Sequence, residues 1–186
     1  GSEVSFEEAG LPDGTTIIIS NLFSHVPARL KFLKTSQSEG NSISDAVEKI
    51  ALSHPDIAVK FTNNNGVRLN TSGNGSLKDV IYTIYGREMT SNILEINHSS
   101  EVLSISGYIG KPEIARGSRA FENYFVNGRF VKDKIISGAI EEAYKGYQMK
   151  GSFPFTAFNI TMEPELLDVN VHPRSEEHTS ELQSRS

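Results

Sequence analysis

The chain has no cysteine and no long apolar run, and each absence excludes a class of protein. Without cysteine, no disulfide bond and no thiolate metal site can form, so a reducing compartment is expected and the cytoplasm is the predicted location. No apolar stretch approaches the roughly 20 residues that a membrane-spanning helix needs, so no membrane partner is expected. The histidines at positions 25, 54, 98 and 172 are scattered, without the spacing of a metal site, and no metal ligand is predicted.

The net charge is also small, at −5 over 186 residues, and does not by itself indicate a nucleic-acid-binding protein. The basic residues are nevertheless unevenly distributed along the chain. Between positions 111 and 134 there are six basic residues against three acidic ones. The six are Lys111, Arg116, Arg119, Arg129, Lys132 and Lys134. A local basic patch of this kind can bind phosphate on a chain that is acidic overall.

The densest signal lies in FENYFVNGRFVKDK, residues 121–134. An aromatic and β-branched run predicts a buried strand, and Asn127-Gly128 predicts a two-residue type I′ turn. Asp133 is the expected N-cap of a helix whose apolar residues recur at i, i+4 and i+8. Basic side chains would then be held at one edge of a sheet. The alternative is an ordinary hairpin whose charges only keep the edge soluble.

The remaining pattern predicts an α/β (α+β) two-layer sandwich in which a mixed sheet carries its helices on one face. Helices are expected over 28–34, from Ser42 with a capping box to His54-Pro55, and from a Ser76 cap to Gly86. Residues 35–41 are predicted as a loop. Strands are expected over 15–20, 57–62, 67–70, 93–98, 101–110, 153–162 and 166–171.

Three separated segments resemble signatures of the MutL family of DNA mismatch repair proteins. They are GTTIIISNLFSHVPARLKFLK from Gly14, FVNGRFVKD from Phe125 and LLDVNVHP from Leu166, in the family's order. The resemblance covers roughly Gly10 to Pro173. It implies an ATP-gated mediator that couples mismatch recognition to downstream repair. Such proteins join a GHKL-type ATP-binding domain to a transducer domain with a ribosomal-protein-like fold.

The same resemblance implies a domain plan for this chain. Residues 1–40 are expected to be the C-terminal edge of a truncated GHKL domain, and residues 41–173 the transducer domain. The first residues resemble neither a signal peptide nor an initiator start, which indicates an internal piece of a longer protein. From Arg174 the sequence departs from the family pattern, and residues 174–186 are predicted to be a translated sequencing-adapter artefact that is disordered.

For the cofactor, Gly14, Thr15 and Thr16 match the late motif of the family's ATP site. ATP and Mg²⁺ are expected in the intact parent protein. The catalytic glutamate, the magnesium-binding asparagine and the lid motifs have no counterpart here. No catalytic residue is therefore predicted, and the fragment alone should bind no cofactor and be inactive. Where the family has a phosphate-sensing lysine after NVHP, this sequence has Ser175.

The predicted DNA-binding residues are the basic side chains around the Asn-Gly turn. They are Arg129, Lys132 and Lys134, with Arg116 and Arg119. Their partner would be the DNA backbone, bound without sequence preference. The family further implies a mismatch-recognition partner of the MutS type and a homodimer in the intact parent. Two alternatives remain, namely the transducer of another GHKL ATPase such as a type II topoisomerase subunit, and a free-standing nucleic-acid-binding module.

Overall fold

The computed structural model describes residues 13–163 of the chain. Three sequence-based predictions therefore lie outside the described residues: the strand over 166–171, the position of Ser175 and the character of residues 174–186. The chain divides into two compact units, residues 1–39 and residues 40–186, and each is described by itself.

In the first unit, one short helix is formed and an expected strand is not. Helix α1 (Pro27–Leu30) has its proline in the first turn, as predicted. Residues 15–20 have no regular secondary structure, so the predicted strand there is wrong. Ile17, Ile18 and Ile19 are 78%, 84% and 74% exposed. A strand needs a neighbour to satisfy its backbone groups, and the described part of this unit provides none.

Helix α2 (Ser36–Ser53) begins well before the sequence pattern indicated. The predicted loop over 35–41 and the capping box at Ser42 are both wrong. Thr35 Oγ1 accepts a hydrogen bond from Ser38 N at 3.3 Å, and Glu39 Oε1 accepts one from Lys34 N at 2.8 Å. These side chains satisfy donors at the start of the helix. The helix ends before His54-Pro55, as predicted.

A hairpin and a kinked helix follow. Strands β1 (Lys60–Asn63) and β2 (Gly66–Asn70) pair antiparallel across two asparagines with positive φ. Helix α3 (Leu77–Ser91) starts at the predicted Ser76 cap, whose side chain accepts from Asp79 N at 3.2 Å. Gly86, the predicted stop, has a φ of 79° and kinks the helix. The helix then continues, so this glycine marks a bend where an end was predicted.

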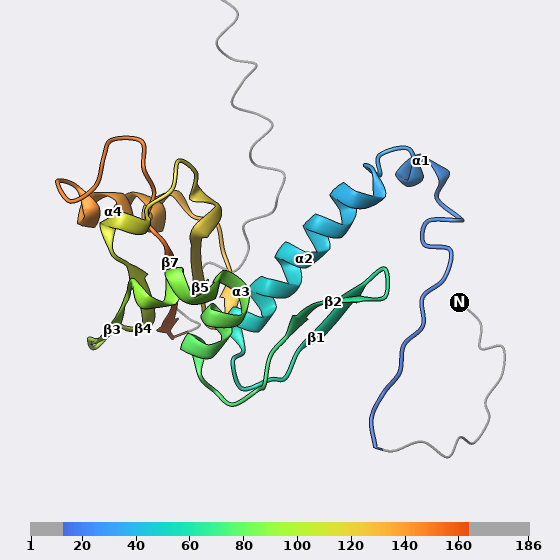
Figure 1. The fold of residues 1–186 in the computed structure, drawn as a ribbon, viewed down its shortest axis with the longest axis horizontal. Coiled ribbons are helices and arrows are strands. Elements are labelled where there is room, and N and C mark those ends of the chain that lie inside the picture. The colour runs from blue at the N-terminus through green and yellow to red at the C-terminus, as the bar shows by residue number, and fades with distance from the viewer. Residues whose placement is uncertain (1–12, 164–186) are drawn as a thin grey trace, which may run out of the picture. The chain divides into compact units, whose positions relative to one another are not determined.

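The central feature is a five-stranded sheet in the order β3-β4-β7-β5-β6 (Figure 1). Its strands are β3 (Ile93–Ser99), β4 (Leu103–Gly110), β5 (Glu122–Val126), β6 (Arg129–Phe130) and β7 (Thr156–Met162). Between β4 and β5 lie two 3₁₀ turns, Pro112–Ile114 and Arg119–Phe121. Strand β7 runs parallel to β5, and the other pairs are antiparallel. The predicted mixed sheet and α/β class are thus confirmed.

The sheet is covered by helices on both faces. Neighbouring residues on β5 divide between two apolar clusters: Phe125 packs with α2 and α3, and Tyr124 packs with α4 (Lys134–Tyr144). Ala157 and Phe158 on β7 divide in the same way. Successive strand residues point to opposite faces, so the two clusters lie on opposite sides of the sheet. The placement of helices therefore differs from the one-face arrangement expected from the sequence.

Candidate functional site

The corner between β5 and β6 is fixed to the central strand β7. Asn127 and Gly128 have φ angles of 49° and 77°, as the predicted type I′ turn requires. The Asn127 amide donates to Met162 O at 2.9 Å and accepts from Met162 N at 3.0 Å. Gly128 N donates to Asn159 Oδ1 at 3.0 Å. These three bonds hold the turn against β7, so its flanking side chains are attached to a well-bonded backbone.

The segment after β6 is fixed as well. Asp133 caps α4 as predicted, because its Oδ1 accepts from Ile135 N at 2.8 Å and from Ile136 N at 3.0 Å. The Tyr124 hydroxyl donates to Asp133 O at 3.1 Å and accepts from Asp133 N at 3.2 Å. Both bonds involve the backbone between Lys132 and Lys134. The two lysines therefore project from a segment that is tied to a buried strand residue.

A cavity of about 600 Å³, the basic cavity, opens beside this segment. Helix α2, strand β5, strand β6 and the start of α4 all contribute to its wall. Its charged lining residues are Asp45, Lys49, Arg119, Glu122, Lys132, Asp133 and Lys134. Ser118, Ala120, Tyr124, Phe130 and Ser137 complete it. Four cationic and three anionic side chains thus share one hollow, which suits a charged ligand more than an apolar one.

The five predicted DNA-binding residues have different surroundings. Lys132 and Lys134 line the basic cavity, and neither forms an ion pair with any residue between 13 and 163. Arg119 lines it too, but its Nε donates to Glu141 Oε1 at 2.8 Å and its guanidinium lies 4.4 Å from the centroid of the Phe153 ring. The exposed Arg129 does not line the cavity.

Arg116 has contacts of its own, with Phe121 and Phe153. Its guanidinium carbon is 5.9 Å from the centroid of the Phe121 ring, and its backbone forms a bridge with Phe153. It does not line the basic cavity. The structure therefore brings together Lys132, Lys134 and Arg119 in one hollow, whereas Arg116 and Arg129 lie outside it.

Three charged residues of the cavity, Asp45, Lys49 and Glu122, were not predicted as site residues from the sequence. Lys49, on α2, is ion-paired with Asp45 one turn earlier, and its Nζ lies 4.6 Å from the centroid of the Phe130 ring. Nothing in the local sequence connects it with a strand eighty residues later. The sequence does single out Glu122, because it is the one charged residue of the strand ENYFV. A carboxylate in a buried strand needs a partner or a function.

Glu122 is the least satisfied charged group of the site. Its side chain is only 2% exposed, and its Oε1 has no hydrogen-bond partner among the described residues. The other oxygen lies 3.9 Å from Arg119 Nε. Burial raises the pKa of this carboxyl to about 7, although the Arg119 charge lowers it and the Glu141 charge adds to the rise.

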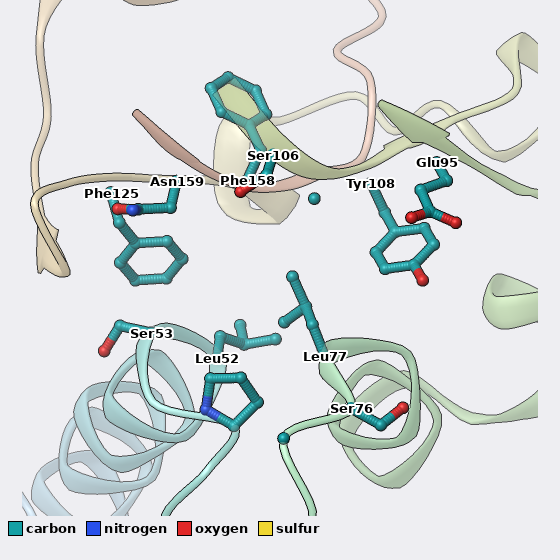
Figure 2. A pocket seen from close by; sticks show the side chains of 13 residues that line it. Leu52, Ser53, Ser76, Leu77, Glu95, Ser106, Tyr108, Phe125, Phe158 and Asn159 are labelled. Atoms are coloured by element: carbon teal, nitrogen blue, oxygen red, sulfur yellow. The ribbon is translucent and has the colours of Figure 1, made fainter. Parts of the chain in front are cut away.

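A second cavity, of about 340 Å³, lies between the sheet and the ends of α2 and α3. Figure 2 shows the Phe125 and Tyr108 rings projecting from the sheet toward Leu52 and Leu77. Its Asn159 amide is already used, because it accepts from Gly128 N and donates to Thr161 Oγ1. Glu95 is its one charged residue. Without cationic side chains, this cavity is a poorer candidate for binding an anion.

The predicted nucleotide residues lie in the first unit. Gly14, Thr15 and Thr16 are all exposed, and they form no part of either cavity. Within residues 13–163, no three acidic or histidine side chains gather as a metal site would require. No helix in that range is long and apolar enough to cross a bilayer.

Comparison with solved structures defines the class of fold. The N-terminal domain of a DNA repair protein superposes with a TM-score of 0.68 at 23% identity, over 83% of this chain and 52% of that one. The Aquifex aeolicus MutL ATPase domain complexed with ADP gives a TM-score of 0.60 at 16% identity, over 78% and 52%. At these identities the likeness establishes the fold alone.

Comparison of sequences identifies the family. The profile described as "DNA mismatch repair protein, C-terminal domain" matches residues 81–178. The DNA mismatch repair protein MutL of Agathobacter rectalis is 60% identical over 92% of this chain and 26% of its own length. That of Clostridium tetani is 45% identical over 95% and 28%. The chain belongs to the MutL family of DNA mismatch repair proteins.

This membership confirms the resemblance drawn from the three motifs. It favours mismatch repair over the type II topoisomerase subunit that the sequence left as an alternative. The chain spans about a quarter of the length of the two relatives.

Proposed function

We propose that this chain is the part of a MutL-type protein that holds the DNA backbone, through the cationic side chains around the corner between β5 and β6. The observation that carries the proposal is the pair Lys132 and Lys134. Both line the basic cavity without an ion pair to any described residue, and the segment that bears them is tied to Tyr124. Cations that no carboxylate neutralises are available to phosphate oxygens.

Arg129 is the third residue of the proposed interface. It is exposed on β6, directly after the turn that is bonded to β7, and forms no ion pair with a residue the structure describes. Arg119 is expected to contribute less, because Glu141 already pairs with it. Contacts of lysine and arginine with phosphates carry no sequence information, so the binding should be non-specific.

The test is a salt titration of the chain with a short fluorescent DNA duplex, followed by anisotropy. Arg129→Glu and Lys132→Glu should each weaken binding roughly five- to tenfold and lower the slope of log affinity against log salt by about 0.9. Lys78→Glu is the matched control, because this exposed lysine at the start of α3 lies outside the basic cavity. The proposal fails if the control and the two test variants bind alike at every salt concentration.

We further propose the domain plan that the sequence predicted. Residues 1–40 would be the edge of a GHKL domain and residues 41–173 the transducer. The exposed isoleucines at 17–19 support this, because neighbouring apolar side chains of such exposure usually meet another part of the protein. The separation into units at residues 39 and 40 lies close to the proposed boundary.

The intact protein would be an ATP-gated mediator, acting in the cytoplasm with a MutS-type partner and as a homodimer. The ADP-bound A. aeolicus neighbour supports a nucleotide in the parent. Gly14, Thr15 and Thr16 offer backbone and hydroxyl groups but no charged side chain, and the described residues contain no acidic cluster for Mg²⁺. These residues do not by themselves make a nucleotide site, so no step of hydrolysis is assigned to this chain.

A further inference from the structure

Of the three acidic residues that line the basic cavity and oppose binding of an anion, only Glu122 is buried, whereas Asp45 and Asp133 are exposed. Glu122 lies at the start of β5, with a side chain 2% exposed and an Oε1 that has no hydrogen-bond partner among residues 13–163. A buried acceptor without a partner destabilises the folded state, and a buried charge does so more strongly. The position is therefore unfavourable for a carboxylate and much less so for a neutral carboxyl group.

The neighbouring cation neutralises Glu122 only in part. Arg119 Nε is 3.9 Å from Glu122 Oε2 but 2.8 Å from Glu141 Oε1, so the guanidinium is engaged mainly by the second carboxylate. Burial and the Glu141 charge raise the pKa of Glu122 to about 7, against the effect of Arg119. The charged groups that share the hollow come from α2, the turn before β5, and the segment from β6 to α4. They are Asp45, Lys49, Arg119, Lys132, Asp133 and Lys134.

We propose that the basic cavity takes up one phosphodiester group of the DNA backbone together with one proton, and that Glu122 receives the proton. This rests on the DNA-binding function proposed above. Lys132 and Lys134 supply the positive charge that attracts the phosphate. An anion that enters the hollow repels the Glu122 carboxylate, and this repulsion is removed when solvent protonates that group. Binding of DNA and binding of the proton therefore favour each other.

The coupling has a measurable size. With half of Glu122 protonated near neutrality, and a bound state that holds the proton about ten times more tightly, affinity should rise about fivefold from about pH 8 to about pH 6. Titration calorimetry near pH 7, in two buffers of different ionisation enthalpy, should then detect uptake of about 0.4 proton per DNA bound. The calorimetry uses the unmodified chain, so it does not depend on any variant folding correctly.

One competing source of pH dependence lies nearby. The imidazole of His54 is close to the Asn-Gly corner, with its Cε1 3.4 Å from the place where a Cβ on Gly128 would stand. Protonation of an imidazole adds a positive charge, which would likewise favour binding of DNA. A pH profile alone would not separate the two groups, so both must be substituted.

The deciding experiment compares three variants with the wild type in DNA anisotropy titrations at about pH 6 and about pH 8. Glu122→Gln should bind almost equally at both pH values, whereas Glu142→Gln and His54→Gln should keep the fivefold change. Glu142 is the matched control, an exposed α4 residue paired with Lys145 outside the cavity. Loss of the pH dependence in His54→Gln, or its retention in Glu122→Gln, overturns the proposal.

The outcomes also separate this inference from the proposed function. Salt-sensitive DNA binding without proton uptake and without a pH effect would remove the role of Glu122 and leave the DNA interface standing. Absence of any salt-sensitive binding would overturn both. Proton uptake in the wild type, together with a flat pH profile in Glu122→Gln, supports the coupling.

Discussion

Two neighbouring residues, Arg119 and Glu122, illustrate how sharing a partner changes the chemistry of a site. The exposed Arg119 interacts with two carboxylates: it donates a hydrogen bond to Glu141, and its Nε lies 3.9 Å from Glu122 Oε2. Its pKa is raised, chiefly by the hydrogen bond to Glu141. Burial dominates at Glu122, whose pKa rises to about 7 in spite of the nearby cation. An adjacent arginine is therefore no guarantee of an ionised carboxylate.

Stability should depend on pH through Glu122. Its pKa is raised from 4.5 in the unfolded chain to about 7 in the fold, so the proton binds the folded state more tightly. The stabilisation is complete below the unfolded pKa and is lost as the pH rises through about 7. Glu122→Gln cannot ionise, so its free energy of unfolding should rise relative to wild type by about 1–2 kcal/mol between about pH 5 and about pH 8. This figure is reduced because solvent screens the charge of the exposed Arg119.

Urea denaturation at several pH values measures this difference. Glu142→Gln serves as the control, because its carboxyl is exposed and pairs with Lys145 at the surface. Parallel pH curves for wild type, Glu122→Gln and Glu142→Gln would contradict the raised pKa.

At the scale of elements, the pairing of β4 with β7 depends on one residue without a side chain. Gly107 has a φ of 142°, and a Cβ there would stand 2.4 Å from Ala157 O and 2.6 Å from Phe158 Cα. Both are main-chain atoms of β7, so a methyl group cannot be accommodated by a rotamer change. The close approach of two backbones is the physical reason for glycine at this position.

Gly107→Ala should cost about 3 kcal/mol or more, because the strands must separate or the register must shift. Gly138, in the middle of α4, is the matched control, since a Cβ there meets nothing within 4 Å. Gly138→Ala should instead stabilise the chain by about 0.5–1 kcal/mol through helix propensity. Urea midpoints of the two variants should shift in opposite directions, and equal shifts would refute the assignment.

Elements with local chemical signals could be predicted from the sequence. The Asp133 and Ser76 caps and the Asn127-Gly128 turn are confirmed, because each depends on residues within three positions of one another. The start of α2 could not be predicted. Its first two turns contain no apolar side chain longer than glycine, so they show no apolar period, and serine-rich segments are typical of loops.

The candidate site was only partly predictable for a different reason. Lys132 and Lys134 stand next to the turn in the sequence, and the structure places both in the basic cavity. Lys49 belongs to a helix far away in the chain and reaches the site through tertiary packing. The ion pair of Arg119 with Glu141 likewise joins residues 22 positions apart. Spacing alone gives neither contact, and the DNA-binding role itself stays a prediction.

At the scale of the whole molecule, buried apolar residues are concentrated in the second unit. All fourteen apolar residues that make up the described core lie between Ala51 and Phe158. In the first unit, by contrast, Ile18 and Phe32 are each 84% exposed. Burial of apolar area supplies most of the free energy of folding, so the stability of the chain should come from residues 40–163.

Two substitutions of the same type test this distribution. Ile18→Ser should change the free energy of unfolding by less than about 0.5 kcal/mol, because little area is buried there. Ile81→Ser, at a fully buried position of α3, should cost about 4 kcal/mol through the lost packing and the buried hydroxyl. Circular dichroism during urea unfolding gives both values. A comparable loss in the two variants would contradict the assignment.

The position of β7 in the sheet sets an order of assembly. This last described strand is placed between β4 and β5, which both precede it in the chain. During synthesis, the hairpin of β3 and β4 and the hairpin of β5 and β6 are completed before β7, and each then has an unpaired inner edge. Until residues 156–162 have emerged, no strand pairing joins the two hairpins, and their unpaired inner edges are exposed to other nascent chains. Completion of the five-stranded sheet therefore waits for β7, and until then a chaperone has exposed strand edges to protect.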